Sequence, residues 1–312
     1  MESLQKTKNR IAGVKNINQI TKAMELVAAT KMRKSQEVML ASRPYAYVAL
    51  DFLANLSKIE EAKMPELLKK REIKKIALIV VASDKGLAGS FNSNIFRNFE
   101  NYLKENNIDV ENPRYSFIAF GQKANNYLER KGIKVENAFL KLGDFVGPQE
   151  TKPLADFLTQ GYLERKWDKV LVFSQHFRSA LKQDVLFRQI LPVEYEILKD
   201  TIKELVPETG RFSEFAQNEP RVSETTMIDY IFEPAPEIVL EKLAEHLVEM
   251  QIYHLILEAN ASEHAARRMA MKSASDNAEE LAEKLTLEYN KSRQAAITKE
   301  IIEIVAGAEA AK

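Results

Sequence analysis

The chain has 312 residues, no formal net charge at neutral pH and no cysteine, with 45% hydrophobic and 29% charged residues. This composition is typical of a soluble protein of about two structural units. The lack of cysteine excludes disulfides, thiol catalysis and cysteine-ligated zinc. The longest apolar run, Ile76–Ala82, is too short to cross a bilayer. The basic N-terminus lacks the apolar core of a secretory signal, so we expect a cytosolic chain that reaches a membrane only through partners.

Residues 1–62 are predicted to form one long helix. Pro44 is expected to kink it, because proline removes a backbone hydrogen bond. Residues 1–58 hold ten Lys/Arg against four Asp/Glu. Apolar or small residues recur at near-heptad steps, as in one strand of a coiled coil: Leu4, Ile11, Val14, Ile17, Ile20, Met24, Val27, Met32, Ser35, Val38, Ser42 and Tyr45.

Residues 73–200 change to a pattern of alternating strands and helices, which predicts a mainly parallel α/β (Rossmann-like) domain of about five strands with right-handed crossovers. A polar connection, residues 201–232, follows. The expected strands are Ile76–Ala82, Tyr115–Phe120, Ile133–Phe139, Val170–Ser174 and Val185–Leu191. The expected helices are Phe91–Lys104, Gly121–Lys131 and Leu154–Lys166.

Residues 233–312 are predicted to form a second long helix, since no proline or glycine occurs between Pro236 and Ile304. Its nine Lys/Arg and fifteen Asp/Glu invert the charge of the N-terminal helix, which favours pairing of the two helices. We therefore expect a long antiparallel coiled coil with the α/β domain inserted between its strands. Its seam repeats at three- and four-residue steps: Leu240, Leu243, Leu247, Met250, His254, Leu257, Ala261, His264, Arg268, Met271, Ser275, Ala278, Ala282 and Leu285.

The loop Ser83–Asn94, with Gly86 and Gly89, is the strongest local candidate for a ligand site. It follows a strand and precedes a helix, where α/β folds bind phosphates. However, Gly-x-x-Gly matches neither the dinucleotide fingerprint nor the phosphate loop of nucleotide hydrolases. A tight structural turn is the preferred interpretation, and a nucleotide site is the alternative.

Histidines and basic residues give weaker signals. His246, His254 and His264 are spaced by eight and ten residues, which is not the i, i+4 spacing of helical metal ligands, so no metal site is expected. The basic cluster 31–34 lacks interleaved aromatic residues, which favours a solvated or protein-facing surface over nucleic-acid binding. Between residues 260 and 277 the seam is small and polar, so either the coil is weak there or a third surface surrounds it.

Several long motifs occur in order along nearly the whole chain. They are Ile20–Ala29, Lys31–Lys34, Ser42–Tyr45, Ser83–Leu87, Phe91–Asn94, Ser262–Arg267, Ala270–Lys272, Asp276–Asn277 and Tyr289–Thr298. In this order they resemble the gamma subunit of F-type ATP synthases, bacterial type.

The resemblance implies a non-catalytic central rotor shaft that couples ion-driven c-ring rotation to ATP synthesis or hydrolysis at the beta-subunit sites through asymmetric contacts. The implied partners are a hexamer of alpha and beta subunits, the epsilon subunit and the c-ring, with one copy of the chain per complex. No cofactor, nucleic acid or membrane span of its own is expected. The implied location is peripheral, on the cytoplasmic face of the bacterial inner membrane.

By the same resemblance, eight residues are candidates for contacts with the beta subunits or for coupling within the shaft: Met24, Lys31, Arg33, Lys34, Arg267, Arg293, Gln294 and Thr298. Plain helix packing is the alternative for Met24. No residue is expected to be catalytic, cofactor-binding or metal-ligating. Two other classes of function stay open: a freestanding α/β nucleotide-binding protein with a coiled-coil arm, and a coiled-coil nucleic-acid or scaffold protein.

Overall fold

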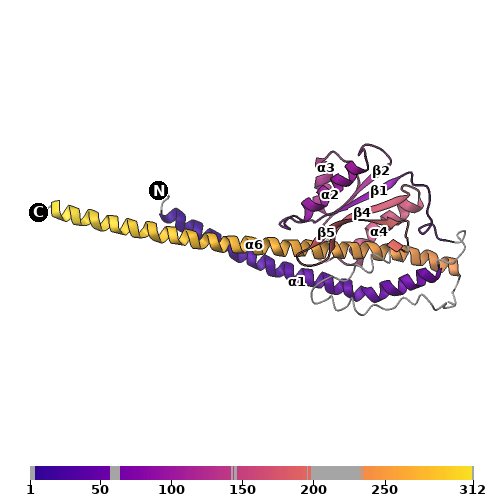
Figure 1. Cartoon of the computed structure of the whole chain (residues 1–312), viewed down its shortest axis with the longest axis horizontal. Coiled ribbons are helices and arrows are strands. Elements are labelled where there is room, and N and C mark those ends of the chain that lie inside the picture. Colours follow the sequence, from indigo (N-terminus) through magenta and orange to yellow (C-terminus); the bar gives the residue numbers. More distant parts are fainter. Residues whose placement is uncertain are drawn as a thin grey trace. The chain divides into compact units, whose positions relative to one another are not determined.

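The computed structural model describes residues 4–56, 64–141, 143, 146–194, 196–197, 233 and 235–310. The chain divides into two compact units, the first formed by residues 1–28 and 267–312 and the second by residues 29–266. Two long helices, α1 (Leu4–Leu56) and α6 (Pro236–Ala310), contribute to both (Figure 1). The predicted connection 201–232 lies outside the described residues, and the predicted domain boundaries and the kink at Pro44 stay predictions.

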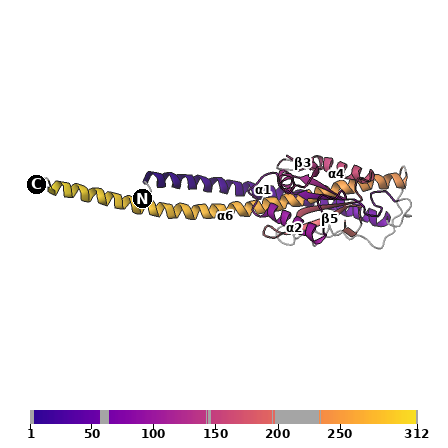
Figure 2. The same cartoon turned by 90° about the horizontal axis from the view of Figure 1, so that it is seen from above.

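In the first unit, α1 and α6 lie side by side (Figures 1 and 2). Val14 and the half-buried Ile11 of α1 pack against Ala278, Ala282 and Leu285 of α6. Small residues in the seam let two helices approach closely. The paired long helices confirm the predicted coiled coil, and its apolar seam in this unit is narrow.

The N-terminal half of this seam differs from its prediction at three bulky positions. Ile17, Ile20 and Val27 are expected inside the seam, but their side chains are 53–59% exposed. Thr21 and Ala28 are buried instead. The buried α1 positions Val14, Thr21 and Ala28 follow each other at seven-residue steps. This step is the coiled-coil repeat, and Ile17, Ile20 and Val27 lie off it.

One polar contact crosses the seam. Ser275 Oγ donates a hydrogen bond to Asn18 Oδ1 at 2.8 Å, and Ser275 is 5% exposed. Polar pairs inside coiled-coil seams restrict the register of the helices. The polar stretch that the sequence indicates is therefore part of the interface and holds a directional contact.

The second unit contains a five-stranded sheet in the order β3-β2-β1-β4-β5. The pairs β1–β2, β1–β4 and β2–β3 are parallel and β4–β5 is antiparallel, which confirms the mainly parallel α/β class. The strands are β1 (Ile76–Val81), β2 (Tyr115–Phe120), β3 (Val135–Phe139), β4 (Lys169–Phe177) and β5 (Gln183–Leu191). The helices between them are α2 (Phe91–Glu105), α3 (Gln122–Arg130) and α4 (Pro148–Leu163).

Helix α4 begins six residues before its predicted start at Leu154. Pro148 occupies the first turn, where its fixed backbone angle favours a helix. The N–H of Gly147 donates to Glu150 Oε2 at 2.8 Å, which completes the helix start. Pro153 lies inside the helix, and this proline is the reason that the sequence pattern indicates a later start.

Different helices cover the two faces of the sheet. Alternate strand residues such as Leu78 and Val80 pack against α2 and α3. The intervening residues, such as Ala77 and Ile79, pack against α4 and also against α6. The α6 residues in this second core are Ala244, Val248, Ile252, Leu255, Ile256 and Ala259. Thus α6 is a coiled-coil strand in the first unit and a sheet-covering helix in the second.

Candidate functional site

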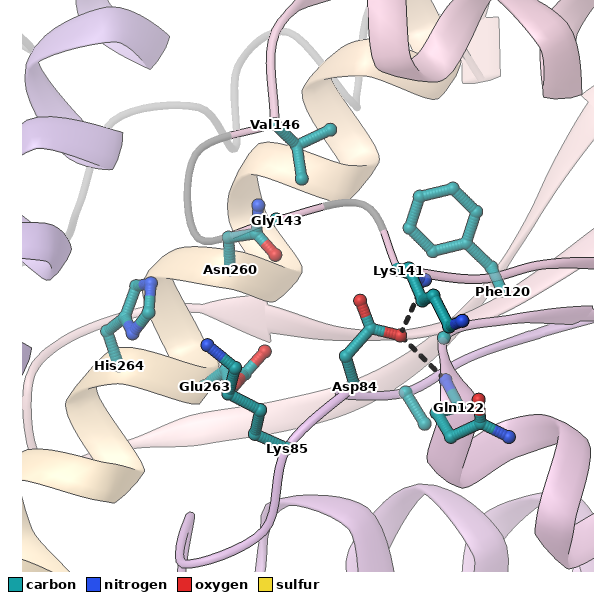
Figure 3. Close-up of a pocket in the computed structure, with 12 residues that line it drawn as sticks. Asp84, Lys85, Phe120, Gln122, Lys141, Gly143, Val146, Asn260, Glu263 and His264 are labelled. Atoms are coloured by element: carbon teal, nitrogen blue, oxygen red, sulfur yellow. Dashed lines mark hydrogen bonds between the residues drawn. The ribbon is translucent and has the colours of Figure 1, made fainter.

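The loop between β1 and α2 holds a carboxylate at the start of α3. Asp84 Oδ1 accepts hydrogen bonds from the backbone N–H groups of Gln122 at 2.8 Å and Lys141 at 3.3 Å (Figure 3). Ser83 Oγ donates to the carbonyl oxygen of Lys85 at 2.6 Å. A helix N-terminus is where a phosphate would bind, but here the first N–H of α3, of Gln122, donates to Asp84 and the next, of Lys123, donates to the carbonyl oxygen of Ser83 at 3.0 Å. The geometry therefore favours the structural-turn interpretation of the Gly-x-x-Gly loop.

A cavity of about 370 Å³ adjoins this loop. Residues at the carboxyl ends of β1, β2 and β3 form one side, and Asn260, Glu263 and His264 of α6 form the other (Figure 3). His264 is 5% exposed. In open α/β sheets this edge is where ligands bind. In this chain, helix α6 covers part of this edge of the sheet.

The loop geometry makes Gly121, immediately before α3, difficult to replace. Its φ is +91°, and an added Cβ would lie 2.0 Å from the carbonyl oxygen of Ala82. We expect Gly121→Ala to lower the free energy of unfolding by about 1–3 kcal/mol, because backbone strain and overpacking add. Urea denaturation measures the change. Gly132→Ala is the matched control, since Gly132 has φ +72° but open space around its Cβ; equal losses in the two variants would contradict the steric argument.

Three charged or titratable side chains from β4, β5 and α6 meet inside the second unit. Glu258 Oε2 lies 2.7 Å from Arg188 Nη1 and 3.0 Å from His176 Nδ1. Arg188 Nη2 lies 3.2 Å from the same nitrogen of His176. Their side chains are only 1–8% exposed. We call these three residues the buried triad.

The buried triad stabilises the ionised form of Glu258. Burial by itself raises the pKa of this carboxyl, but the positive charge of Arg188 and the hydrogen bond with His176 outweigh it and hold the pKa below 4.5. A buried carboxylate is tolerated because its charge is paired. Removal of Arg188 or Glu258 alone would leave the charge of the other inside the protein without this counter-ion.

His254, one turn before Glu258 on α6, is 2% exposed. Burial lowers its pKa from 6.5 to about 4, although the charge of Glu258 acts in the opposite direction. The unfolded chain therefore takes up a proton near pH 6.5, while the folded chain does not until about pH 4. The free energy of unfolding must consequently fall as the pH drops through this interval.

We expect His254→Gln to remove this decrease in the free energy of unfolding, which reaches about 3 kcal/mol near pH 4. Urea denaturation at a series of pH values measures it. His246→Gln on the same helix is the control, because the His246 side chain is 55% exposed. A His254→Gln variant with the pH dependence of the unsubstituted protein would contradict this assignment.

The eight candidate coupling residues do not form one cluster. Three lie in the second unit and five in the first. Lys31, Arg33 and Lys34 belong to the second unit; Met24, Arg267, Arg293, Gln294 and Thr298 belong to the first. Met24, Lys31 and Arg267 are half-buried and the other five are exposed.

Local contacts distinguish some of these residues. Thr298 Oγ1 donates to the carbonyl oxygen of Gln294 at 2.9 Å, so the two lie on one face of α6. Arg33 Nε lies 2.8 Å from Glu37 Oε1, within α1. Lys34 lines a second cavity of about 250 Å³ together with residues of α4 and α6. These side chains present charge and hydrogen-bonding groups outward rather than converging on one site.

Both helices of the first unit expose aliphatic residues, and those at the end of α6 lie beyond the predicted seam. After Leu285, the last buried seam residue, α1 no longer covers α6. The end of the predicted seam at this residue is the sequence signal that could have indicated the exposed surface. Large exposed apolar surfaces mark sites of contact with other proteins. The exposed residues are Ile297, Ile301, Ile302, Ile304 and Val305 on α6 and Ile17, Ile20, Leu26 and Val27 on α1, with 48–70% exposure.

A protein of this construction acts through the surfaces of its helices. The first unit exposes aliphatic and charged side chains along two paired helices, and in the second unit one of those helices covers the ligand edge of the sheet. None of the helices in the described ranges is long and apolar enough to cross a bilayer. These properties indicate a helical component of a larger assembly.

A family model described as ATP synthase matches residues 3–311. The chain is 38% identical over 312 residues to the ATP synthase gamma chain of Trichlorobacter lovleyi, with 100% of both chains covered. It is 36% identical over 316 residues to the ATP synthase gamma chain of Trichormus variabilis, with 99% of each covered. The chain belongs to the ATP synthase gamma-chain family, which confirms the resemblance, and as a gamma chain it is a non-catalytic subunit.

Solved structures share the fold. One is the central stalk and c-ring of the Tetrahymena thermophila mitochondrial ATP synthase, with a TM-score of 0.57 and 23% identity, covering 82% of this chain and 99% of that one. Another is a Euglena gracilis mitochondrial ATP synthase assembly, with a TM-score of 0.61 and 18% identity, covering 98% of this chain and 94% of that one. At these identities the likeness supports the fold alone.

Proposed function

We propose that this chain is the rotor shaft of a bacterial F-type ATP synthase, turning with the c-ring inside a hexamer of alpha and beta subunits. The observation that carries the proposal is the exposed aliphatic surface of the first unit. A lone chain gains nothing from exposing such residues, whereas a surrounding ring of subunits would cover them. The second unit would bind the epsilon subunit and the c-ring.

Asymmetry of the shaft supplies the coupling. Along residues 4–28, α1 carries five basic residues and one acidic residue, whereas α6 carries seven basic and eight acidic residues along 267–310. Three beta subunits around such a shaft meet different charges and shapes, so each is held in a different nucleotide-affinity state. Rotation exchanges these contacts, and their differences in free energy link rotation to nucleotide binding.

We assign the direct contacts to the exposed candidates Arg33, Lys34, Arg293, Gln294 and Thr298. The half-buried Met24, Lys31 and Arg267 combine contact with packing within the shaft. As a gamma chain, the protein belongs to the peripheral part of the synthase. We place it on the cytoplasmic face of the inner membrane, where it follows the c-ring without crossing the bilayer.

The test is native purification of the affinity-tagged chain from gently solubilised membranes, with identification of the co-eluting subunits and an ATPase assay. Co-elution of alpha and beta subunits in equal number, with an activity that the chain alone lacks, is the expected result. Elution alone or on nucleic acid would overturn the proposal.

A contact variant sharpens this test. We expect Arg293→Ala to lower ATP-driven ion pumping by about fivefold, the lower end of typical coupling effects. Lys284→Ala is the matched control, because Lys284 is an exposed basic residue of the same helix whose charge is paired with Glu280 at 2.5 Å. Equal pumping by the two variants would contradict the assignment of Arg293 to the contact surface.

A further inference from the structure

In the second unit, α6 rests on the sheet through residues at four-residue steps. Ala244, Val248, Ile252 and Ile256 all belong to the same apolar core. Such a row repeats along the helix axis, so a shift of one turn, about 5.4 Å, would place each residue near its neighbour's position. Apolar contact is non-directional. This row alone therefore resists axial slippage of α6 only weakly.

The buried triad has the directionality that the apolar row lacks. Glu258 of α6 is held by Arg188 Nη1 of β5 at 2.7 Å and by His176 Nδ1 of β4 at 3.0 Å. A one-turn slip would replace Glu258 by His254 or Ser262, and the charge of Arg188 would lose its carboxylate. Uncompensated buried charges cost several kcal/mol. The triad therefore opposes the displacement that the apolar row tolerates.

We propose that His176, Arg188 and Glu258 form the joint that transmits torque between the sheet of the second unit and the shaft helix α6. The inference rests on the proposed rotor function, in which the sheet-bearing unit receives load from the c-ring and α6 carries it onward. The three are positioning residues: they fix the axial and rotational register of α6 on β4 and β5 and touch no substrate.

A paired apolar substitution separates this role from simple stability. Replacing both Arg188 and Glu258 by Met and Leu (R188M/E258L) leaves no unpaired charge, and apolar replacement of a buried ion pair is often neutral for stability. The matched control is K152M/E249L, which makes the same replacements in an ion pair that joins α4 to α6 and is 33–55% exposed. Both variants keep the apolar row.

The first readout is the register of α6 in the membrane-bound complex during ATP hydrolysis. The chain has no cysteine, so spin labels can be placed at Lys134→Cys before β3 and Lys242→Cys on α6, both exposed. We expect one distance in the unsubstituted chain and in K152M/E249L. In R188M/E258L we expect a second population displaced by about one helical turn, about 5 Å.

The second readout is the ratio of ATP-driven ion pumping to ATP hydrolysis. We expect R188M/E258L to lose at least about fivefold in this ratio, the lower end of typical coupling effects, while K152M/E249L keeps it. A single distance and an unchanged ratio in R188M/E258L would overturn the proposal, as would equal changes in the control.

If R188M/E258L does not fold, Glu258→Gln carries the same two readouts, because it keeps the size of the side chain and removes the ion pair. A native register and a native ratio in that variant would then overturn the proposal. Co-elution of the unsubstituted chain with alpha and beta subunits tests the rotor function separately, so the two proposals can fail independently.

Discussion

Replacing Trp167 by alanine is expected to lower the free energy of unfolding of the second unit by about 3–5 kcal/mol, the usual cost of removing a large buried aromatic residue. The indole is fully buried, and its Nε1 donates to the carbonyl oxygen of Leu158 at 3.0 Å. Its ring occupies the space that a Cβ on Gly161 would need, 2.0 Å away. The surrounding helix therefore cannot collapse into the cavity without backbone movement.

Urea denaturation followed by circular dichroism measures this effect, since the variant lacks the chain's single tryptophan. Phe187→Ala is the control, because Phe187 is another large aromatic residue but is 60% exposed. We expect Phe187→Ala to lower the free energy of unfolding by about 1 kcal/mol or less. A Trp167→Ala loss no greater than that of the control would show that the residues around the indole repack.

Glu258→Ala is expected to cost about 3–5 kcal/mol near neutral pH, because Arg188 would remain charged and buried without its carboxylate. The folded-state pKa of Glu258 is lowered below 4.5. Its stabilisation is therefore complete above that value and is lost as the pH falls through the folded-state pKa. The difference between the variant and the unsubstituted protein must shrink in acid.

Denaturation at several pH values between neutrality and the acid range measures this difference. Glu249→Ala is the control on the same helix, since its side chain is 33% exposed and its partner Lys152 is 55% exposed. Exposed ion pairs contribute at most about 1 kcal/mol. A Glu258→Ala loss that stays constant with pH, or one as small as the control's, would contradict the role of the buried ion pair.

The main elements could be predicted from local patterns. The apolar run from Ile76 and the alternation at Tyr115–Phe120 predicted β1 and β2 closely. The C-terminal seam positions from Leu240 to Leu285 are nearly all buried. A period of two or of three to four residues is a local property, so the sequence carries it without knowledge of the partner.

The remaining features depend on contacts between distant residues. Whether Ile20 faces the seam or solvent depends on which face of α1 meets α6, a helix that begins only at Pro236. The pairing of Glu258 could not be predicted, because a single acidic residue among apolar residues gives the same sequence pattern whether or not Arg188 contacts it. The site residues Arg293 and Thr298 came from the family resemblance, and their roles stay predictions.

The participation of α6 in the core of the sheet has a consequence for synthesis of the chain. The strands end at Leu191, but residues such as Val248 and Ile256 that cover one of their faces leave the ribosome only later. Until then α4 covers only part of that apolar face, and such exposed surfaces promote aggregation during folding. Contacts so distant in sequence also form slowly. A nascent chain stalled before Pro236 would therefore depend on chaperones, whereas one released after Ala266 has every segment that the second unit requires.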